Sequence, residues 1–282
     1  MSRLNALFTR AVGGTAILLL VLVQGCTTPP AAPKIPTLAE IPEIYPGVLA
    51  GYLPPEQLPD SLSILPPPPL PGSPAYDYDI ARNHQVTTEV DPARWALAAA
   101  DANLHFPAAA SAFDCALGAR VGPDTTPNLY LMMRRTLADA GLATYMAKNA
   151  YQRQRPFMVN GGPICTPKER ETLSKDGSYP SGHTAYGWAW ALILSEVAPE
   201  RGNVILARGL QFGESRVVCN VHWPSDVVAG RIMGAAAVAQ MHDNPVFRAQ
   251  LDAAKVEWQA LDKATAAKSL ECSGMDPVVS VP

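Results

Sequence analysis

Three separated groups of residues in this chain could together bind and cleave a phosphate ester. In chain order they are Lys148 and Arg155, then Ser181, Gly182 and His183, then Arg216, His222 and Asp226. The three cations can surround a dianion, because guanidinium forks match phosphate oxygens and an ammonium adds a point charge. The turn before His183 is predicted to begin a helix, whose hydroxyl and backbone N–H donors would add to the phosphate site.

The two histidines of these groups suggest acid–base and nucleophilic chemistry. His222 and Asp226 are four residues apart, so in a helix the carboxylate can reach the imidazole and fix its tautomer. That is the arrangement of a nucleophile or base with an orienting partner. His183 would lie beside the same phosphate site, which predicts that one histidine attacks phosphorus while the other protonates the leaving oxygen.

Together the motifs resemble the three-part signature of the type 2 phosphatidic acid phosphatase superfamily. The matching segments are Lys148-x6-Arg155-Pro156, Pro180-Ser181-Gly182-His183 and Ser215-Arg216-x5-His222-x3-Asp226, and the likeness covers roughly residues 76–241. An exported chain with this signature is similar to bacterial class A non-specific acid phosphatases. The resemblance implies a helical bundle of the acid phosphatase and vanadium haloperoxidase type.

The resemblance also implies a role for each motif position. His222 would be the nucleophile that forms a phosphohistidine, Asp226 would hold it, and His183 would protonate the leaving alcohol and then help to activate water. The phosphoryl oxygens would be bound by Lys148, Arg155, Ser181, Gly182 and Arg216. No metal and no other cofactor is implied. The substrates would be phosphomonoesters, the product inorganic phosphate, and the pH optimum acidic to near neutral.

Other functions remain open on the sequence alone. They are a lipid phosphatase acting on phospholipid or lipid A, a vanadium haloperoxidase, and a phosphate-binding lipoprotein without activity. The net charge of −3 argues against general binding of nucleic acid. A homo-oligomer is compatible with the sequence.

The first residues have the composition of an export signal. Arg3 and Arg10 accompany an apolar run over residues 11–23, which is too short for a comfortable membrane span. The following Gly25-Cys26 resembles the lipobox of bacterial lipoproteins. We therefore expect a signal peptide at residues 1–25 and a lipid on Cys26, with an ordinary secretory cleavage near Gly25 as the alternative. Thr27 favours the outer membrane and a periplasmic domain.

Export would place the remaining cysteines in a compartment where disulfides can form. Four are left after Cys26, an even number in an oxidising compartment, and they predict two disulfides among Cys115, Cys165, Cys219 and Cys272. Three pairings are possible and the sequence does not choose between them. No C-x-x-C pair is present, which argues against a zinc site.

The elements that must position the motifs are predicted to be helices. Residues 26–74 are rich in proline and are expected to form a polyproline tether, followed by a helical domain at 75–270 and a tail at 271–282. Apolar periodicity and capping residues predict helices over residues 92–103, 125–152, 181–198, 202–214, 222–243 and 244–268. Lys148 and Arg155 would then share one helix face. Arg153 is expected at the surface, with a contribution to the site as the alternative. Trp223 is a candidate for the pocket wall. The predicted fold is a single all-α domain.

Overall fold

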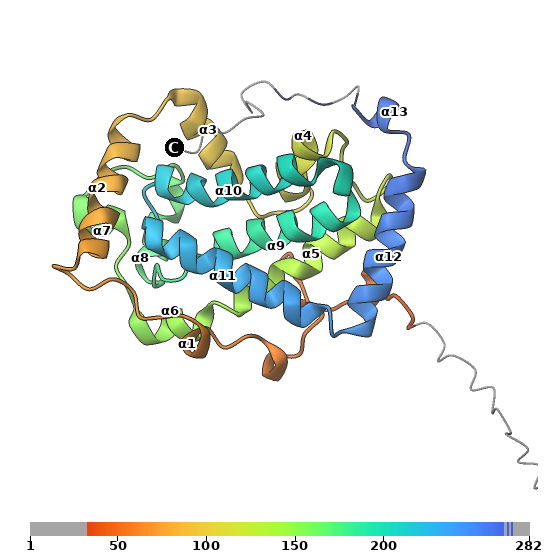
Figure 1. Ribbon diagram of the computed structural model, residues 1–282, viewed down its shortest axis with the longest axis horizontal. Coiled ribbons are helices and arrows are strands. Elements are labelled where there is room, and N and C mark those ends of the chain that lie inside the picture. Colours follow the sequence, from red (N-terminus) through yellow and green to blue (C-terminus); the bar gives the residue numbers. More distant parts are fainter. Residues whose placement is uncertain (1–32, 268–269, 271, 273–282) are drawn as a thin grey trace, which may run out of the picture. The chain divides into compact units, whose positions relative to one another are not determined.

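Four long helices form the centre of the fold (Figure 1). They are α5 (Pro127–Leu142), α9 (Gly182–Val197), α10 (Gly202–Val218) and α11 (Pro224–Met241). Helix α9 lies between α10 and α11 and also packs on α5. Its sequence is apolar on all sides, as expected of a helix that is surrounded by others. Trp190, Ile193 and Leu194 of α9 are buried accordingly.

The computed structural model describes residues 33–267, 270 and 272. The predicted signal peptide, the predicted lipidation site Cys26 and nearly all of the predicted tail at 271–282 lie outside the described residues.

Around the central helices are α1 (Ser61–Ile64), α2 (Pro74–Thr88), α3 (Pro92–Asp101), α4 (Asp114–Leu117), α6 (Tyr145–Tyr151), α7 (Pro156–Asn160), α8 (Arg170–Ser174), α12 (Pro245–Ala260) and α13 (Lys263–Ala267). Among these described helices, none has both the length and the apolar character that crossing a bilayer requires.

The prediction of an all-α domain is confirmed, with corrections in detail. The predicted helix over residues 125–152 is two helices, since α5 ends where the Thr144 hydroxyl donates to the Gly141 carbonyl. The predicted helix over 244–268 also divides, because the chain is extended at Leu261. Helix α2 was not predicted, and neither was a short antiparallel pair of strands, β1 (Glu43–Tyr45) and β2 (Val48–Leu49).

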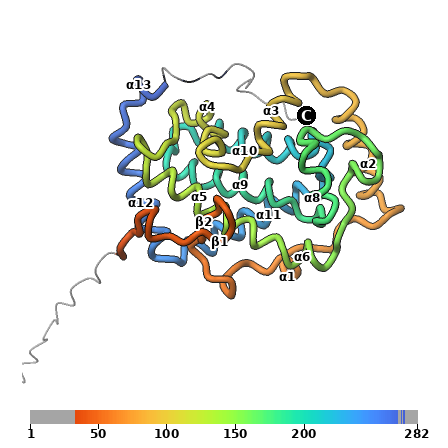
Figure 2. The backbone as a smooth tube through the Cα atoms, turned by 180° about the vertical axis from the view of Figure 1, so that it is seen from behind, coloured from red at the N-terminus to blue at the C-terminus, as the bar shows by residue number. Residues whose placement is uncertain are grey.

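The described part of the predicted tether, residues 33–74, does not behave as a free spacer. We call residues 33–73 the N-terminal strap. Its Leu49, Tyr52, Leu53 and Leu65 are buried against the helices, and Figure 2 shows the strap running past β1, β2 and α1 toward α2. The prediction of a tether is therefore wrong here, because apolar side chains between the prolines have a core to join.

One buried carboxylate fixes the strap. Both oxygens of Asp139 on α5 accept the backbone N–H of Tyr52, at 3.1 and 2.8 Å, and Oδ1 also accepts that of Leu53 at 3.0 Å. The Tyr52 hydroxyl donates to Gln250 of α12 at 2.6 Å. Burial raises the pKa of Asp139 to about 6. The three N–H bonds offset part of that desolvation and attach the strap to the centre of the fold.

Two disulfides are present, as predicted, and the structure selects their pairing. Cys115 is bonded to Cys272, and Cys165 to Cys219. The second bridge joins the segment after α7 to the end of α10, three residues before His222. It therefore limits the movement of the loop that carries the predicted nucleophile.

Gly51→Ala tests the packing of the strap. A Cβ at residue 51 would lie 2.0 Å from Oδ1 of Asp139, so either the strap or the carboxylate must move and their hydrogen bonds weaken. We expect the free energy of unfolding to fall by about 1–3 kcal/mol, measured by urea denaturation with the disulfides intact. Gly202→Ala is the control, because its Cβ would meet only the Cβ of Ser195 at 3.9 Å. Equal stability of the two variants would contradict a packed strap.

Candidate active site

The three motifs meet where helix ends converge. The backbone N–H of Ser181, the N-cap of α9, donates to the carbonyl of Asp226 in the first turn of α11 at 3.0 Å. Gly230 permits this approach, since a Cβ there would lie 2.4 Å from the Ser181 carbonyl oxygen. The prediction that a helix begins at Ser181 is confirmed, and its hydroxyl accepts the N–H of Thr184 at 3.3 Å.

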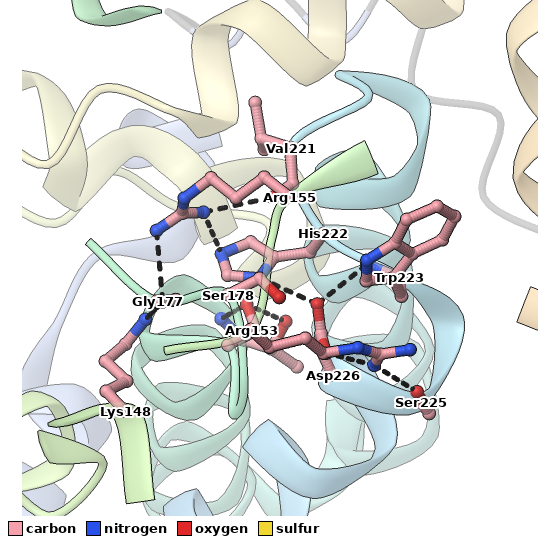
Figure 3. Close-up of polar contacts among 12 residues, drawn as sticks. Lys148, Arg153, Arg155, Gly177, Ser178, Val221, His222, Trp223, Ser225 and Asp226 are labelled. Carbon is pink, nitrogen blue, oxygen red and sulfur yellow. Dashed lines mark hydrogen bonds and ion pairs between the residues drawn. The ribbon is translucent and has the colours of Figure 1, made fainter. Parts of the chain in front are cut away.

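Lys148 and Arg155 reach the site from different elements. Lys148 lies on α6, the chain then turns through a left-handed residue at Gln152 (φ 44°), and Arg155 is the N-cap of α7. The prediction of one shared helix face is therefore wrong. Both side chains are buried and still converge, because both donate to Asp176 Oδ2, at 3.4 Å for Lys148 Nζ and 2.9 Å for Arg155 Nη2. Lys148 also donates to the Gly177 carbonyl at 2.6 Å (Figure 3).

Arg216 is a buried cation whose guanidinium has no hydrogen-bond partner in the part of the chain that the structure describes. None of its three side-chain nitrogens has a hydrogen-bond partner among residues 33–267, 270 and 272. Burial, reinforced by the charge of Arg155, lowers the pKa of Arg216 to about 10, so it remains charged at neutral pH. A buried charge without a counterion is costly. Arg216 is therefore well placed to receive an anion.

His222 is held between a guanidinium and a carboxylate (Figure 3). Its Nε2 is 3.0 Å from Nη1 of Arg155, and its Nδ1 is 3.4 Å from Oδ2 of Asp226. Since a guanidinium only donates, Nε2 must accept, which places the imidazole proton on Nδ1. Burial, followed by the charges of Arg155, Lys148 and Arg216, holds the pKa of His222 well below its usual value. A neutral imidazole whose Nε2 is unprotonated can act as a nucleophile once a phosphate takes the place of the guanidinium hydrogen bond.

Asp226 keeps this orientation although His222 lies outside the helix. The prediction of a helix beginning at residue 222 is wrong by two residues, since α11 begins at Pro224. Asp226 accepts the N–H of Trp223 at 2.8 Å and a bond from Arg153 Nη1 at 2.6 Å. Burial raises the pKa of Asp226, whereas these donors lower it. The position at a helix N-terminus also favours a negative charge.

His183 lies within electrostatic reach of the same cluster. Its Nε2 is 3.1 Å from the carbonyl oxygen of Ala102, which can only accept, so Nε2 carries a proton. Burial lowers the pKa of His183 well below its usual value, and the nearby Arg216, His222 and Arg155 lower it further. The structure thus brings both predicted histidines and the predicted cations to one place.

Several residues at this place were missed or misjudged from the sequence. Arg153 was expected at the surface, but its guanidinium is largely buried and paired with Asp226 and Asp79. Asp176 lies in a loop four residues before Pro180, where no pattern distinguishes it. Ser178 contributes a backbone hydrogen bond to His222 and a side-chain hydrogen bond to Asp226.

Two motif neighbours have structural partners. Trp223 is buried, and its indole N–H donates to the carbonyl of Gln154 at 2.8 Å. The Ser215 hydroxyl donates to Asp101 at 2.5 Å in a buried network. Within the described part of the chain, no three His, Cys, Asp or Glu side chains gather as metal ligands would.

Comparison with known proteins agrees with this geometry. The family model described as PAP2 superfamily matches residues 130–247, which include all three motifs. A non-specific acid phosphatase of Providencia stuartii is 44% identical over 223 residues, covering 79% of this chain and 88% of the relative. The chain belongs to the PAP2 superfamily. The predicted resemblance to this superfamily is confirmed.

Further relatives place the chain within the superfamily. A non-specific acid phosphatase of Salmonella typhimurium is 42% identical over 210 residues, covering 74% of this chain and 83% of the relative. A lipid A 1-phosphatase of Rhizobium johnstonii is 29% identical over 100 residues, which is 36% of this chain. The likeness to the acid phosphatases thus extends over far more of the chain than the likeness to the lipid A enzyme.

Asp176→Asn tests whether this carboxylate competes with phosphate for Lys148 and Arg155. The side chain of Asp176 is 36% exposed, and such an ion pair is worth about 0.4–1 kcal/mol. Removing its charge should therefore tighten the binding of inorganic phosphate roughly two- to fivefold. Calorimetry at about pH 6 measures this, because Lys148, whose pKa burial lowers to about 8, is still protonated there.

The matched control is Glu171→Gln, which removes the carboxylate of an exposed ion pair with Lys175. Phosphate binding to this variant should equal that of the wild type. If Asp176→Asn bound phosphate no more tightly than Glu171→Gln, Asp176 would not compete for the cations.

Proposed function

We propose that this member of the PAP2 superfamily is an exported non-specific acid phosphatase that hydrolyses phosphomonoesters through a phosphohistidine on His222. The observation that carries the proposal is the neutral imidazole of His222, whose Nε2 lone pair faces Arg155 within a buried group of cations. The names and coverage of the acid phosphatase relatives support the same activity.

The phosphoryl group would bind among the cations. Arg216, which lacks a partner in the described part of the chain, and Lys148 and Arg155, which now contact Asp176, would hold the phosphoryl oxygens. At the N-terminus of α9, the hydroxyl of Ser181 and the backbone N–H of Gly182 would add donors. These groups stabilise the charge that develops on the oxygens during transfer.

Two displacements would complete the reaction. Nε2 of His222 attacks phosphorus, the bond from phosphorus to the ester oxygen breaks, and His183 gives a proton to the leaving alcohol. His183 then takes a proton from water, which attacks the phosphohistidine and releases inorganic phosphate with His222 restored. Asp226 stabilises the positive imidazole ring throughout.

A lipid phosphatase is the second candidate, and the partial likeness to a lipid A 1-phosphatase supports it. Release of phosphate from nucleoside monophosphates and sugar phosphates should exceed release from detergent-dispersed phosphatidate and lipid A. The reverse order would favour the lipid enzyme. Bromide oxidation in the presence of vanadate and peroxide would instead indicate a haloperoxidase.

We also propose that Cys26 carries a lipid and anchors a periplasmic domain at the outer membrane. The support is the segment Val23-Gln24-Gly25-Cys26 after a basic and apolar start, together with two disulfides that require an oxidising compartment. Cys26→Ser should move the protein from the membrane fraction to the soluble periplasmic fraction without loss of activity. Equal fractionation of variant and wild type would indicate ordinary secretion.

His222→Ala tests the nucleophile. We expect phosphate release to fall by at least about 10³-fold, more than the loss of one oxyanion donor costs, and the phosphoenzyme trapped by acid quench to disappear. The exposed His105 provides the control, because His105→Ala should behave as wild type. Wild-type activity should survive EDTA and be greatest at acidic to near-neutral pH, since His222 stays neutral in mild acid while His183 needs its proton. Full hydrolysis by His222→Ala would overturn the assignment.

A further inference from the structure

A chain of buried charges extends behind the predicted nucleophile. Arg153 Nη1 donates to Oδ1 of Asp226 at 2.6 Å, and its Nη2 donates to Oδ2 of Asp79 on α2 at 2.8 Å. The side chains of Asp79 and Asp226 are 1% and 0% exposed, and that of Arg153 is 9% exposed. Figure 3 shows the guanidinium of Arg153 beside Ser225, on the side of Asp226 that faces away from Lys148 and Arg155. The guanidinium thus contacts the orienting carboxylate without belonging to the phosphate site.

Asp79 connects this charge chain to the start of α11. Its Oδ1 accepts the backbone N–H of Ser225 at 2.9 Å, and its Oδ2 accepts the Ser225 hydroxyl at 2.5 Å. Arg153 Nη1 also donates to that hydroxyl at 2.7 Å. Ser225 directly precedes Asp226, so α2 and Arg153 together fix the turn that presents the carboxylate.

The positive charge of Arg153 and the negative charges of Asp79 and Asp226 stabilise one another. Asp226 is fully buried, and desolvation alone would favour its neutral form; the charge of Arg153 is the largest influence in the opposite direction. Without Arg153, two buried carboxylates would lie next to the same serine with no cation between them. One of them would then hold a proton. A protonated Asp226 cannot stabilise the positive ring that His222 acquires during phosphoryl transfer.

We propose that Arg153, itself oriented by Asp79, is a positioning residue that keeps Asp226 ionised and aimed at Nδ1 of His222. The proposal rests on the proposed function for its effect on rate. Its effect on the imidazole does not depend on that function, because the hydrogen bond from Nδ1 of His222 to Asp226 and the titration of His222 can be observed without substrate.

The pH dependence of this arrangement involves every charged group near Asp226. Arg153 and Asp79 face it from one side and His222 from the other, and at longer range the titratable groups are Lys148, Arg155 and Tyr179. Loss of Arg153 raises the pKa of Asp226, so the carboxylate is lost as the pH falls through that higher value. The acid limb of kcat should therefore move to higher pH.

The test compares Arg153→Gln with Arg153→Lys. We expect Arg153→Gln to lower kcat roughly 10- to 100-fold, by analogy with the hydrogen-bond partners that orient metal-bound histidines. KM should change little, because Arg153 does not touch the phosphate site. The loss should be largest at low pH and partly recover as pH rises. Arg153→Lys should regain much of the activity, since it restores the charge between the carboxylates.

Asp79 provides the decisive second variant. In the Arg153→Gln background, Asp79→Asn removes one of the two unpaired carboxylates, so the double variant should have a higher kcat than Arg153→Gln alone. Asp77→Asn, an exposed residue of the same helix, should have no such effect. A purely structural role predicts instead that the double variant is worse and that the pH profile keeps its shape, which would overturn the proposal.

Nitrogen NMR of His222 separates this proposal from the proposed function. Arg155 keeps the imidazole proton on Nδ1 in both proteins, so the readout is the Nδ1–H hydrogen bond to Asp226 and the titration of His222. In Arg153→Gln the Nδ1 resonance should move and the pKa of His222 should fall further, because a neutral Asp226 no longer favours the protonated ring. This readout holds even if the wild type releases no phosphate, an outcome that would defeat the proposed function alone. An unchanged Nδ1 resonance and an unchanged titration of His222 in Arg153→Gln would overturn the role of Arg153.

Discussion

The structure depends on the burial of positive charge at one point where helix ends meet. Lys148, Arg155 and Arg216 are each at most 3% exposed, and the desolvation of three neighbouring cations opposes folding. Two of them find a substitute anion in Asp176, whereas the guanidinium of Arg216 finds none within the described residues. Such an arrangement persists only if the surrounding packing imposes it. The close contact of α9 with α10 and α11, and the disulfide from Cys219, supply that constraint.

The residues of the motifs could be predicted from the sequence because chemistry restricts their types. The spatial arrangement of these residues could not be predicted from the sequence. Lys148 and Arg155 fit one helix by spacing, but Gln152 takes a left-handed conformation that ends α6, and convergence comes from Asp176 in a distant loop. Arg153 looks like a surface residue because its partner Asp79 is 74 positions away. Local periodicity carries no information about such long-range pairs.

The fold was predictable where the buried side of an element is apolar. Helices α9 and α11 follow directly from that pattern, but the buried residues of α2 are Asp79 and Asn83, so periodicity of apolar residues does not detect it. The prediction for the strap was wrong for the opposite reason. Its high proline content is typical of a spacer, whereas its few apolar residues pack against a core that exists only once the helices have folded. In both cases the structure of the segment is determined by contacts with residues far away in the chain, and the local sequence does not show these contacts.

The burial that suits one histidine opposes the task of the other. A low pKa keeps His222 neutral in mild acid, as the proposed nucleophile must be, yet burial and the charges of Arg216 and Arg155 also lower the pKa of His183, which the proposed reaction requires to be protonated. A phosphate dianion would resolve this conflict, because its charge offsets that of Arg216, the largest electrostatic influence on His183. The acid would then gain its proton together with the substrate. In the proposed reaction, His222 would meet the dianion with its lone pair, and the ring would become positive only after phosphorus is bonded, when Asp226 is already in place. Electrostatics that look unfavourable without a substrate would thus become favourable in the order that the proposed chemistry requires.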